Sequence, residues 1–295
     1  MKIYNASLSI KVLKKFNKRF PNKKINVLRS YGLRNKDDAL FRTKYRNKCS
    51  SLIEDSGTYS ANNREPGTGP SITFNGYLKY IKRNGKSYDW YFNYDIDFNN
   101  HGFDTNIYYQ KRMEDAGLNP VPVVHSIYGY EIDHYVKSGY KVVALGSSQI
   151  TNLDILRYAM DKFKGTGIKI HLFGNTTFEF LTSFPIYSCD STSWANTGRF
   201  GDIKYWNPKK QGLNKTDRFN LEEYSPPREN VTLLSEYKYR EELYEYLHET
   251  LGVTKMDLFG PEGTYYKQLV NLYYFVQLEE IVNDIHQAKS FNIKK

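Results

Sequence analysis

Residues 140–174, YKVVALGSSQITNLDILRYAMDKFKGTGIKIHLFG, contain the pattern that decides the fold. Two short β-rich runs, 140–146 and 168–174, lie on either side of a longer segment. In that segment, 149–165, apolar residues recur at spacings of three and four, which is typical of an amphipathic helix. A glycine ends each of the three pieces. The stretch therefore predicts a strand, a crossover helix and a second, parallel strand.

The same alternation of short β-rich runs and helix-like segments continues along most of the chain. Further candidate helices cover 101–117 and 129–139. Eight strands in this arrangement favour a (β/α)8 TIM barrel over residues 1–206, although a doubly wound sheet would also fit. The N-terminal run MKIYNASL is a further candidate strand that would decorate the barrel. The predicted barrel strands are 24–31, 51–55, 89–97, 119–126, 140–146, 168–174, 186–190 and 202–206.

Two further segments follow the predicted barrel. Residues 207–230 are polar and basic and include Pro226 and Pro227, so we expect a long loop or linker there. Residues 231–295 have a strongly helical pattern and would form C-terminal helices that pack on the barrel. The predicted architecture is thus an α/β protein, a TIM barrel with a C-terminal helical extension.

Composition limits the class of protein and its partners. The chain has 295 residues and a formal net charge of +10, so a polyanion such as nucleic acid is a natural partner. The 27 tyrosines and 17 phenylalanines fit this, because aromatic rings stack on bases, but an AT-rich genome would also explain the Lys, Asn and Tyr content. Cys49 and Cys189 are too few for a disulfide framework or a multi-cysteine zinc site. Without a signal peptide or a long apolar run, the sequence predicts a soluble, cytoplasmic protein with no membrane partner.

Polar residues stand at the ends of several predicted strands. These are Asp55, Asp95 with Asp97, His125 and Asp190, while Gly146 and Phe173 with Gly174 end two other strands. In a barrel, the carboxyl ends of the strands form one rim, so we expect these residues to converge there. Each residue alone also has a structural explanation: the aspartates could cap helices or turns, and a single histidine is more often part of a core. Only their convergence points to a site for a polar ligand.

The order of motifs resembles the tRNA-guanine transglycosylase superfamily, a (β/α)8 barrel that exchanges guanine for a 7-deazaguanine. The motifs run collinearly over about half the chain: EDSGTYS, NYDIDF, VPVVHS, GYKVVALGSSQ, IHLFGN and YSCDSTSW, followed by TGRFGDI. The histidine of VPVVHS and the CDSTSW ending look more like the DNA-modifying branch, the DpdA-type 7-deazaguanine DNA transglycosylases often carried by phages. A phage-encoded protein of this kind would act in the host cytoplasm.

The resemblance assigns roles to residues in the first two motifs. Asp55 would be the acidic residue beneath the base, and Tyr59 would be an aromatic residue that stacks on it. Asp95 corresponds to the second, base-recognising aspartate of the family, with Asp97 as the fallback if the register is shifted by two.

The later motifs supply the rest of the implied site. The backbone from Val142 through Val143 to Gly146 would contact the base, although valines replace the family's glycines. Phe173 would be the opposite stacking residue, and His125 stands where the tRNA enzymes have a base-contacting glutamine. Asp190 stands where those enzymes have their nucleophilic aspartate, and the family's zinc subdomain is missing. The resemblance therefore implies no metal and no cofactor, and it puts tRNA in doubt as the substrate.

The implied reaction replaces guanine in DNA by a 7-deazaguanine such as preQ0. Breaking the C1′–N9 bond passes through an oxocarbenium-like transition state, which a carboxylate can trap covalently, and Asp190 suits that role. Asp55 would be the general acid and base, with a pKa raised by neighbouring carboxylates and a dry pocket. Because a base inside a duplex cannot be reached, it must be flipped out or presented on a single strand. The basic runs 14–24, 42–48 and 207–215 would hold the backbone, although each could also be an ordinary solvated surface.

Three alternatives stay open at this point. The same fold could serve a zinc-less tRNA-guanine transglycosylase, or a catalytically inactive barrel that only binds nucleic acid. A plain glycosidase could use Asp55 and Asp190 as its pair of carboxylates. The sequence also leaves open whether a partner protein helps to open the DNA.

Overall fold

The computed structural model describes residues 1–62, 72–96, 98, 102–221 and 232–291. Two compact units make up the chain. The first contains Met1–Ser7, Ile25–Ser191 and Val282–Lys295, and the second contains Leu8–Lys24 and Thr192–Ile281. The chain therefore enters the second unit twice, once near its start and once after residue 191. No helix in the described ranges is long and apolar enough to cross a membrane.

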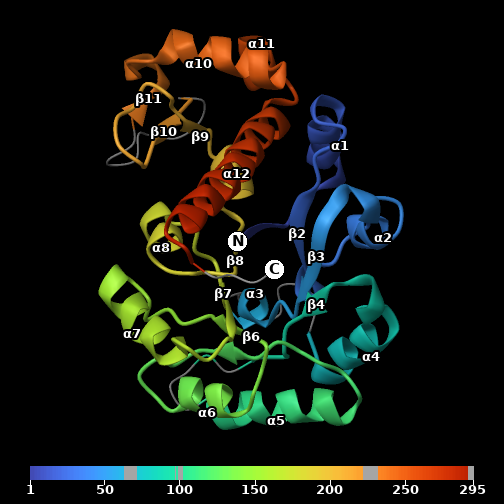
Figure 1. Cartoon of the computed structure of the whole chain (residues 1–295). Helices are drawn as coiled ribbons and strands as arrows, with labels where there is room; N and C mark the ends of the chain where they lie inside the picture. Colours follow the sequence, from blue (N-terminus) through green and yellow to red (C-terminus); the bar gives the residue numbers. More distant parts are fainter. Residues whose placement is uncertain (63–71, 97, 99–101, 222–231, 292–295) are drawn as a thin grey trace. The chain divides into compact units, whose positions relative to one another are not determined.

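The first unit contains an eight-stranded parallel sheet, which curls into a barrel-like arrangement with intervening helices (Figure 1). The strand order is β4-β3-β2-β1-β8-β7-β6-β5, so strands adjacent in sequence pair with each other and β8 returns to β1. At the two edges, Phe92 and Val121 form a single parallel bridge. This topology confirms the predicted (β/α)8 fold. The strands are β1 (Lys2–Ala6), β2 (Ile25–Ser30), β3 (Cys49–Asp55), β4 (Trp90–Tyr91), β5 (Val123–Val124), β6 (Val142–Leu145), β7 (Lys169–Leu172) and β8 (Ser188–Ser191).

The helices of the first unit follow the periodicity of the sequence. In α7, Asn152 caps the start by accepting hydrogen bonds from the backbone N–H groups of Asp154 and Ile155. Leu156, Ala159, Met160 and Phe163 are its buried residues, which gives one apolar face. The helices are η1 (Tyr31–Leu33), α2 (Asp37–Arg42), η2 (Arg46–Lys48), α3 (Thr58–Asn62), α4 (Phe74–Asn84), η3 (Gly85–Ser87), α5 (Phe103–Asp115), α6 (Glu131–Lys137), α7 (Leu153–Phe163) and α8 (Phe178–Ser183).

A cluster of side chains from different strands fills the core of the sheet. Its buried members are Tyr4, Ala6, Leu28, Ile53, Phe92, Val121, Val123 and Ala144, with Trp90, Val142 and Phe173 packed against them. Because side chains alternate along a strand, the presence of Val142 and Ala144 in this cluster places Val143 on the other face of the sheet. The interior of the barrel is thus packed, as is usual for this fold.

Two strand predictions were wrong. The N-terminal run is not decoration: β1 pairs on both sides, with Tyr4 opposite Asn26 of β2 and Asp190 of β8. Tyr4 is fully buried, which explains why this strand belongs to the core. Conversely, 202–206 is β9 (Asp202–Trp206) and pairs antiparallel with β10 (Thr216–Asn220) in a separate sheet.

The second unit combines a three-stranded sheet, β11-β10-β9, with helices. Asn271 is fully buried at its centre: its side-chain Nδ2 donates to the carbonyls of Trp194 and Asp202, and its Oδ1 accepts from the N–H of Lys204. The remaining elements are α1 (Ile10–Arg19), α9 (Ser193–Arg199), β11 (Thr232–Leu233), η4 (Leu234–Glu236), α10 (Arg240–Tyr246), η5 (Leu247–Leu251), α11 (Lys255–Phe259) and the long C-terminal helix α12 (Gly263–Ala288).

The predicted linker over 207–230 is in part ordered structure. Strand β10 lies inside it and forms the centre of the small sheet. The rest of that prediction, 222–230, lies outside the described residues. The final turns of α12 belong to the first unit, where the His286 ring lies 2.6 Å from the carbonyl oxygen of Leu181. The predicted C-terminal helical extension is therefore present.

Candidate active site

Asp55 is the last residue of β3 and is held by the turn that follows it. The N–H of Gly57 donates to Asp55 Oδ2 at 3.0 Å, and Ser30 Oγ donates to the same oxygen at 3.4 Å. Gly57 has φ +80°, and a Cβ there would lie 2.6 Å from the backbone nitrogen of Gly32. Only glycine suits this close approach, so the turn depends on it.

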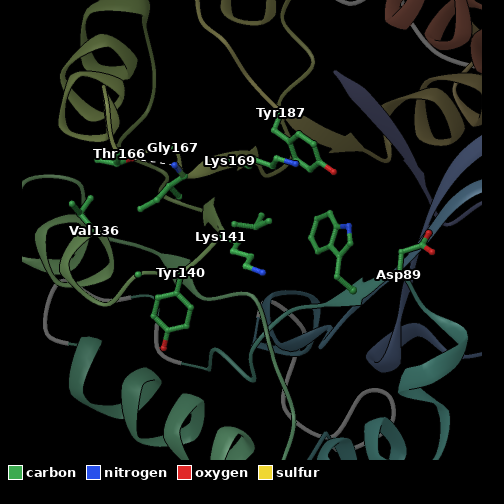
Figure 2. Close-up of a pocket in the computed structure, with 12 residues that line it drawn as sticks. Asp89, Val136, Tyr140, Lys141, Thr166, Gly167, Lys169 and Tyr187 are labelled. Atoms are coloured by element: carbon green, nitrogen blue, oxygen red, sulfur yellow. Dashed lines mark hydrogen bonds between the residues drawn. The ribbon is translucent and has the colours of Figure 1, made fainter. Parts of the chain in front are cut away.

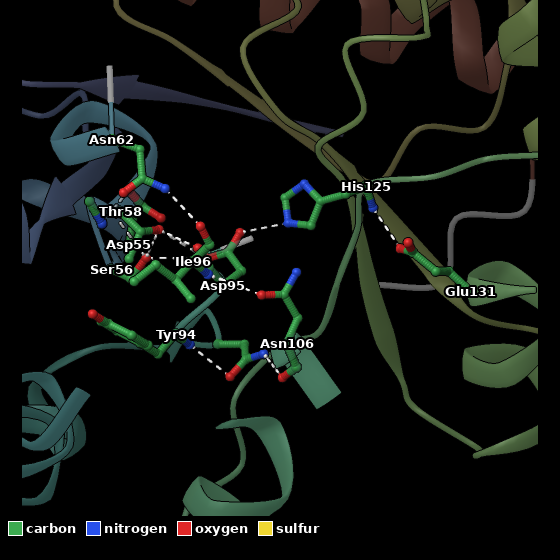
Figure 3. Close-up of polar contacts among 12 residues, drawn as sticks. Asp55, Ser56, Thr58, Asn62, Tyr94, Asp95, Ile96, Asn106, His125 and Glu131 are labelled. Atoms are coloured by element: carbon green, nitrogen blue, oxygen red, sulfur yellow. Dashed lines mark hydrogen bonds and ion pairs between the residues drawn. The ribbon is translucent and has the colours of Figure 1, made fainter. Parts of the chain in front are cut away.

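Asp95 lies just beyond β4 and is buried beside the same turn. Its Oδ1 accepts a hydrogen bond from Ser56 Oγ at 3.2 Å, and its Oδ2 lies 3.0 Å from His125 Nε2. Thr58 Oγ1 donates to the Asp95 carbonyl. Figure 3 shows Asp55, Ser56 and Thr58 on one side of Asp95 and His125 on the other. The predicted fallback, Asp97, lies outside the described residues.

His125 follows β5, and its position is fixed by neighbours on two sides. Its backbone N–H donates to Glu131 Oε2 at 2.7 Å, and burial raises the pKa of Glu131. A Cβ at Gly146 would lie 3.4 Å from His125 Cε1 and 2.9 Å from Val123 Cγ1. A larger residue at position 146 would therefore crowd Val123 and the His125 ring, and glycine leaves room for both.

Asp190 lies in β8 and is buried beside the end of β7. Its Oδ1 accepts from the N–H of Gly174 at 3.0 Å and lies 3.4 Å from Nε2 of His171. The other ring nitrogen of His171, Nδ1, lies 2.9 Å from Ser188 Oγ. The carboxylate is thus fixed on the strand by a backbone donor and has an imidazole next to it.

His171 was missed by the sequence reasoning. The ring is fully buried among aromatic side chains, with centroids 5.1 Å from Phe92, 5.4 Å from Trp90 and 4.8 Å from Phe173. Alternation along KIHLF puts His171 on the same face as Phe173, and the register pairs it with Ser188. The sequence did contain one signal for this residue. His171 is polar and lies two positions before Phe173, a predicted site residue, on the same face of the strand.

Electrostatic interactions connect the three aspartates. Burial, followed by the charges of Asp95 and Asp190, raises the pKa of Asp55 from 3.8 to about 7. Hydrogen bonds from the backbone of Gly57 and Ser56 oppose this increase. A carboxyl with a pKa near 7 exchanges protons readily at neutral pH, which is the property that a general acid and base needs.

The two residues predicted to stack on the base, Tyr59 and Phe173, lie in different surroundings. Tyr59, in α3, is 68% exposed, and its ring centroid lies 5.7 Å from that of Phe98. Phe98 in turn lies 4.8 Å from the His125 ring, so Tyr59 belongs to the rim of the site. Phe173 is packed against Phe92, with the ring centroids 4.3 Å apart, and its neighbour Gly174 bonds to Asp190.

The structure does not bring Val142 and Val143 into the site. Val142 is the first residue of β6 and lies at the opposite end of that strand from Gly146. Val143 is fully buried and faces away from the interior cluster. Of the implied backbone contacts, only Gly146 lies beside His125.

The predicted basic runs are partly engaged within the protein. In 14–24, Lys15 pairs with Glu262 and Lys23 with Glu280. In 42–48, Arg46 pairs with Asp89, and in 207–215, Lys210 pairs with Asp217. Several of these cations thus have carboxylate partners, which lessens their value for holding a nucleic-acid backbone.

Comparison with known proteins adds no family to this picture. No protein-family model matches the chain, and no curated protein matches it either. The resemblance to guanine transglycosylases therefore stays a prediction from short motifs. In the described part of the chain, no group of three or more His, Cys, Asp or Glu side chains could hold a metal ion.

Proposed function

We propose that this protein is a base-exchange transglycosylase that replaces guanine in DNA with a 7-deazaguanine. The observation that carries the proposal is the grouping of three aspartates at the carboxyl edge of one parallel sheet, in which Asp95 and Asp190 both raise the pKa of Asp55. In a TIM barrel this edge is where catalytic side chains lie. A protein that only bound a partner would gain nothing from crowding these carboxylates together.

Asp190 is the nucleophile in this proposal. One of its carboxylate oxygens attacks C1′ of the nucleotide, the C1′–N9 bond breaks, and the bonding electron pair leaves on N9. The hydrogen bond from the Gly174 N–H fixes Oδ1 of Asp190, so that Oδ2 is the oxygen left to attack. A covalent deoxyribosyl ester then holds the sugar while the bases exchange.

Asp55 manages the protons. In its protonated form it gives a proton to the departing guanine, and in its ionised form it accepts the proton of the incoming 7-deazaguanine. The incoming nitrogen then attacks C1′, the ester bond breaks, and the electron pair returns to Asp190. A pKa of about 7 lets Asp55 serve both steps at neutral pH.

Asp95 and His125 recognise the base. A carboxylate accepts hydrogen bonds from the N1–H and the exocyclic amine of guanine. Ser56 and Thr58 donate to Oδ1 of Asp95, and His125 lies beside Oδ2, so these neighbours would hold the carboxylate in place for the base. The His125 ring would donate to O6 or N7. Tyr59 would cover one face of the purine from the rim, with Phe173 on the other side.

Exposed tyrosines near the same edge support a nucleic-acid substrate. Tyr59 follows β3, and Tyr128 and Tyr130 follow β5, with exposed fractions of 68%, 57% and 60%. Exposed rings beside a base pocket suit stacking on the unpaired bases of a single strand. We therefore favour single-stranded or locally opened DNA, with tRNA as the alternative polymer.

Nucleoside mass spectrometry tests the proposal in cells. Total DNA and total tRNA would be digested from cells that make the protein and have a supply of preQ0, with the Asp190→Ala variant in parallel. We expect a deazaguanine nucleoside in DNA with the unaltered protein and none with the variant. The same signal in tRNA alone would assign the protein to tRNA, and silence in both polymers would refute base exchange.

A further inference from the structure

A cavity lies at the amino end of the barrel strands, the end opposite to the aspartates. Its volume is about 560 Å³, and its lining includes Trp90, Val142 and Lys169, the first residues of β4, β6 and β7 (Figure 2). The aspartates lie at the carboxyl ends of the strands, so the two sites are separate. The amino end of a TIM barrel usually serves stability, and an open cavity of ligand size there needs another explanation.

Two lysines give this cavity a local positive charge. Lys141 immediately precedes β6 and Lys169 begins the neighbouring β7, and the N–H of Lys169 donates to the carbonyl of Lys141 at 3.0 Å. Among the ion pairs of the described residues, neither lysine has a carboxylate within 4.0 Å. Figure 2 shows both side chains reaching from one side of the cavity, with Asp89 on the opposite side.

Asp89 does not offset these charges, because its carboxylate is already engaged. Oδ1 accepts from Arg46 at 2.7 Å, and Oδ2 accepts from Ser51 Oγ at 2.7 Å and from the N–H of Leu52 at 2.8 Å. The two ammonium groups therefore leave the lining of the cavity with a net positive charge, which attracts an anion. The cavity is thus electrostatically suited to a phosphate group.

Aromatic side chains form part of the remaining wall, together with the aliphatic Val136, Val142 and Ile168. Trp90, Tyr140 and Tyr187 line the cavity, and Lys169 Nζ lies 4.7 Å from the centroid of the Tyr187 ring. Flat apolar walls beside two cations fit a ligand that carries a planar ring and a negative charge. The volume falls within the range of about 300 to 1,000 Å³ that is usual for small-molecule sites.

We propose that this cavity binds a nucleoside monophosphate, with the phosphate on Lys141 and Lys169 and the base against Trp90 and Tyr187. The inference is independent of the proposed reaction, because it uses none of the three aspartates. A ligand at this end would stabilise the strands that carry the opposite rim, because binding to the folded state alone raises stability.

Isothermal titration calorimetry on the full chain tests this inference, with AMP, adenosine and inorganic phosphate as separate probes. We expect AMP to bind at least about tenfold more tightly than either fragment, and more weakly as salt is added. The double variant Lys141→Gln/Lys169→Gln should weaken AMP binding by about tenfold or more. Lys164→Gln, a change of an exposed lysine outside the cavity, should leave it unchanged.

Several outcomes would overturn the inference. These are no saturable heat with AMP, an affinity for phosphate equal to that for AMP, and an AMP affinity that the double variant does not change. Thermal melting of each variant would show that it is folded before titration. Asp190→Ala should bind AMP as the unaltered protein does, so a failure of base exchange and a failure of this site would be told apart.

Discussion

Replacing Asp55 by Asn should stabilise the protein, and the gain should depend on pH. The folded protein raises the pKa of this carboxyl from 3.8 to about 7, chiefly by burial and then by the charges of Asp95 and Asp190. The folded state therefore holds its proton to higher pH than the unfolded chain does. Stability from this group is fully present below about pH 4 and is lost as the pH rises through about 7.

The size of the effect follows from the two pKa values. Each pKa unit corresponds to about 1.4 kcal/mol, so the ionised carboxyl costs the folded state about 4 kcal/mol above pH 7. At pH 5, where the folded carboxyl is still protonated, the cost is only about 1.5 kcal/mol. Asn has the same shape, can still accept from the Gly57 N–H and carries no charge. The gain from Asp55→Asn should thus be about 3 kcal/mol larger at pH 8 than at pH 5.

Urea unfolding at the two pH values measures this difference directly. Asp161→Asn is the matched control, because Asp161 is an exposed carboxylate on α7 whose replacement should give the same small change at both pH values. An equal effect of Asp55→Asn at pH 5 and pH 8, or a loss of stability at pH 8, would show that the carboxyl is not strained by its neighbours. The role of Asp55 as a proton carrier at neutral pH would then lose its basis.

Three further predictions concern the same site. Gly57→Ala should lower the free energy of unfolding by about 1–3 kcal/mol or more, because position 57 has a positive φ and a Cβ there would clash with Gly32. Gly165→Ala is the control: position 165 also has a positive φ but open space around it, so this change should cost less in the same urea experiment. His171→Phe should keep the ring packing and remove the nitrogen beside Asp190, lowering the kcat of base exchange by about 100-fold with little change in KM; an unchanged kcat would exclude a positioning role. The pH profile of the exchange rate should bend near pH 7, and the bend should move to lower pH in Asp95→Asn because one charge that raises the pKa of Asp55 is gone; a fixed bend would point to another group.

The sequence was most informative where local pattern and global fold agree. In 140–174, strand propensity, helix periodicity and the Asn152 cap all specify the same βαβ unit, and the structure has β6, α7 and β7 there. The ends of the strands also predicted the position of Asp55, His125 and Asp190. A parallel barrel brings such positions to one edge whatever their separation in sequence.

The failures have physical causes as well. The run 1–8 and the run 202–206 have similar β-rich patterns, and only tertiary pairing decides that the first enters the barrel and the second enters another sheet. His171 escaped notice because its role depends on the register between β7 and β8, which pairs it with Ser188. Val142 was placed in the site by motif alignment, but it lies four positions before Gly146 along the strand, or about 13 Å at the rise of a strand.

The most direct test of the central claim uses purified protein, isotope-labelled guanine and single-stranded DNA. This assay works whichever 7-deazaguanine the protein inserts, because labelled guanine can attack the covalent intermediate that the departing, unlabelled guanine leaves behind. We expect label to enter the DNA with the unaltered protein, and we expect Asp190→Ala to stay folded but to incorporate none. Label that enters equally with both proteins would contradict Asp190 as nucleophile, and no label with either DNA or tRNA would contradict base exchange itself.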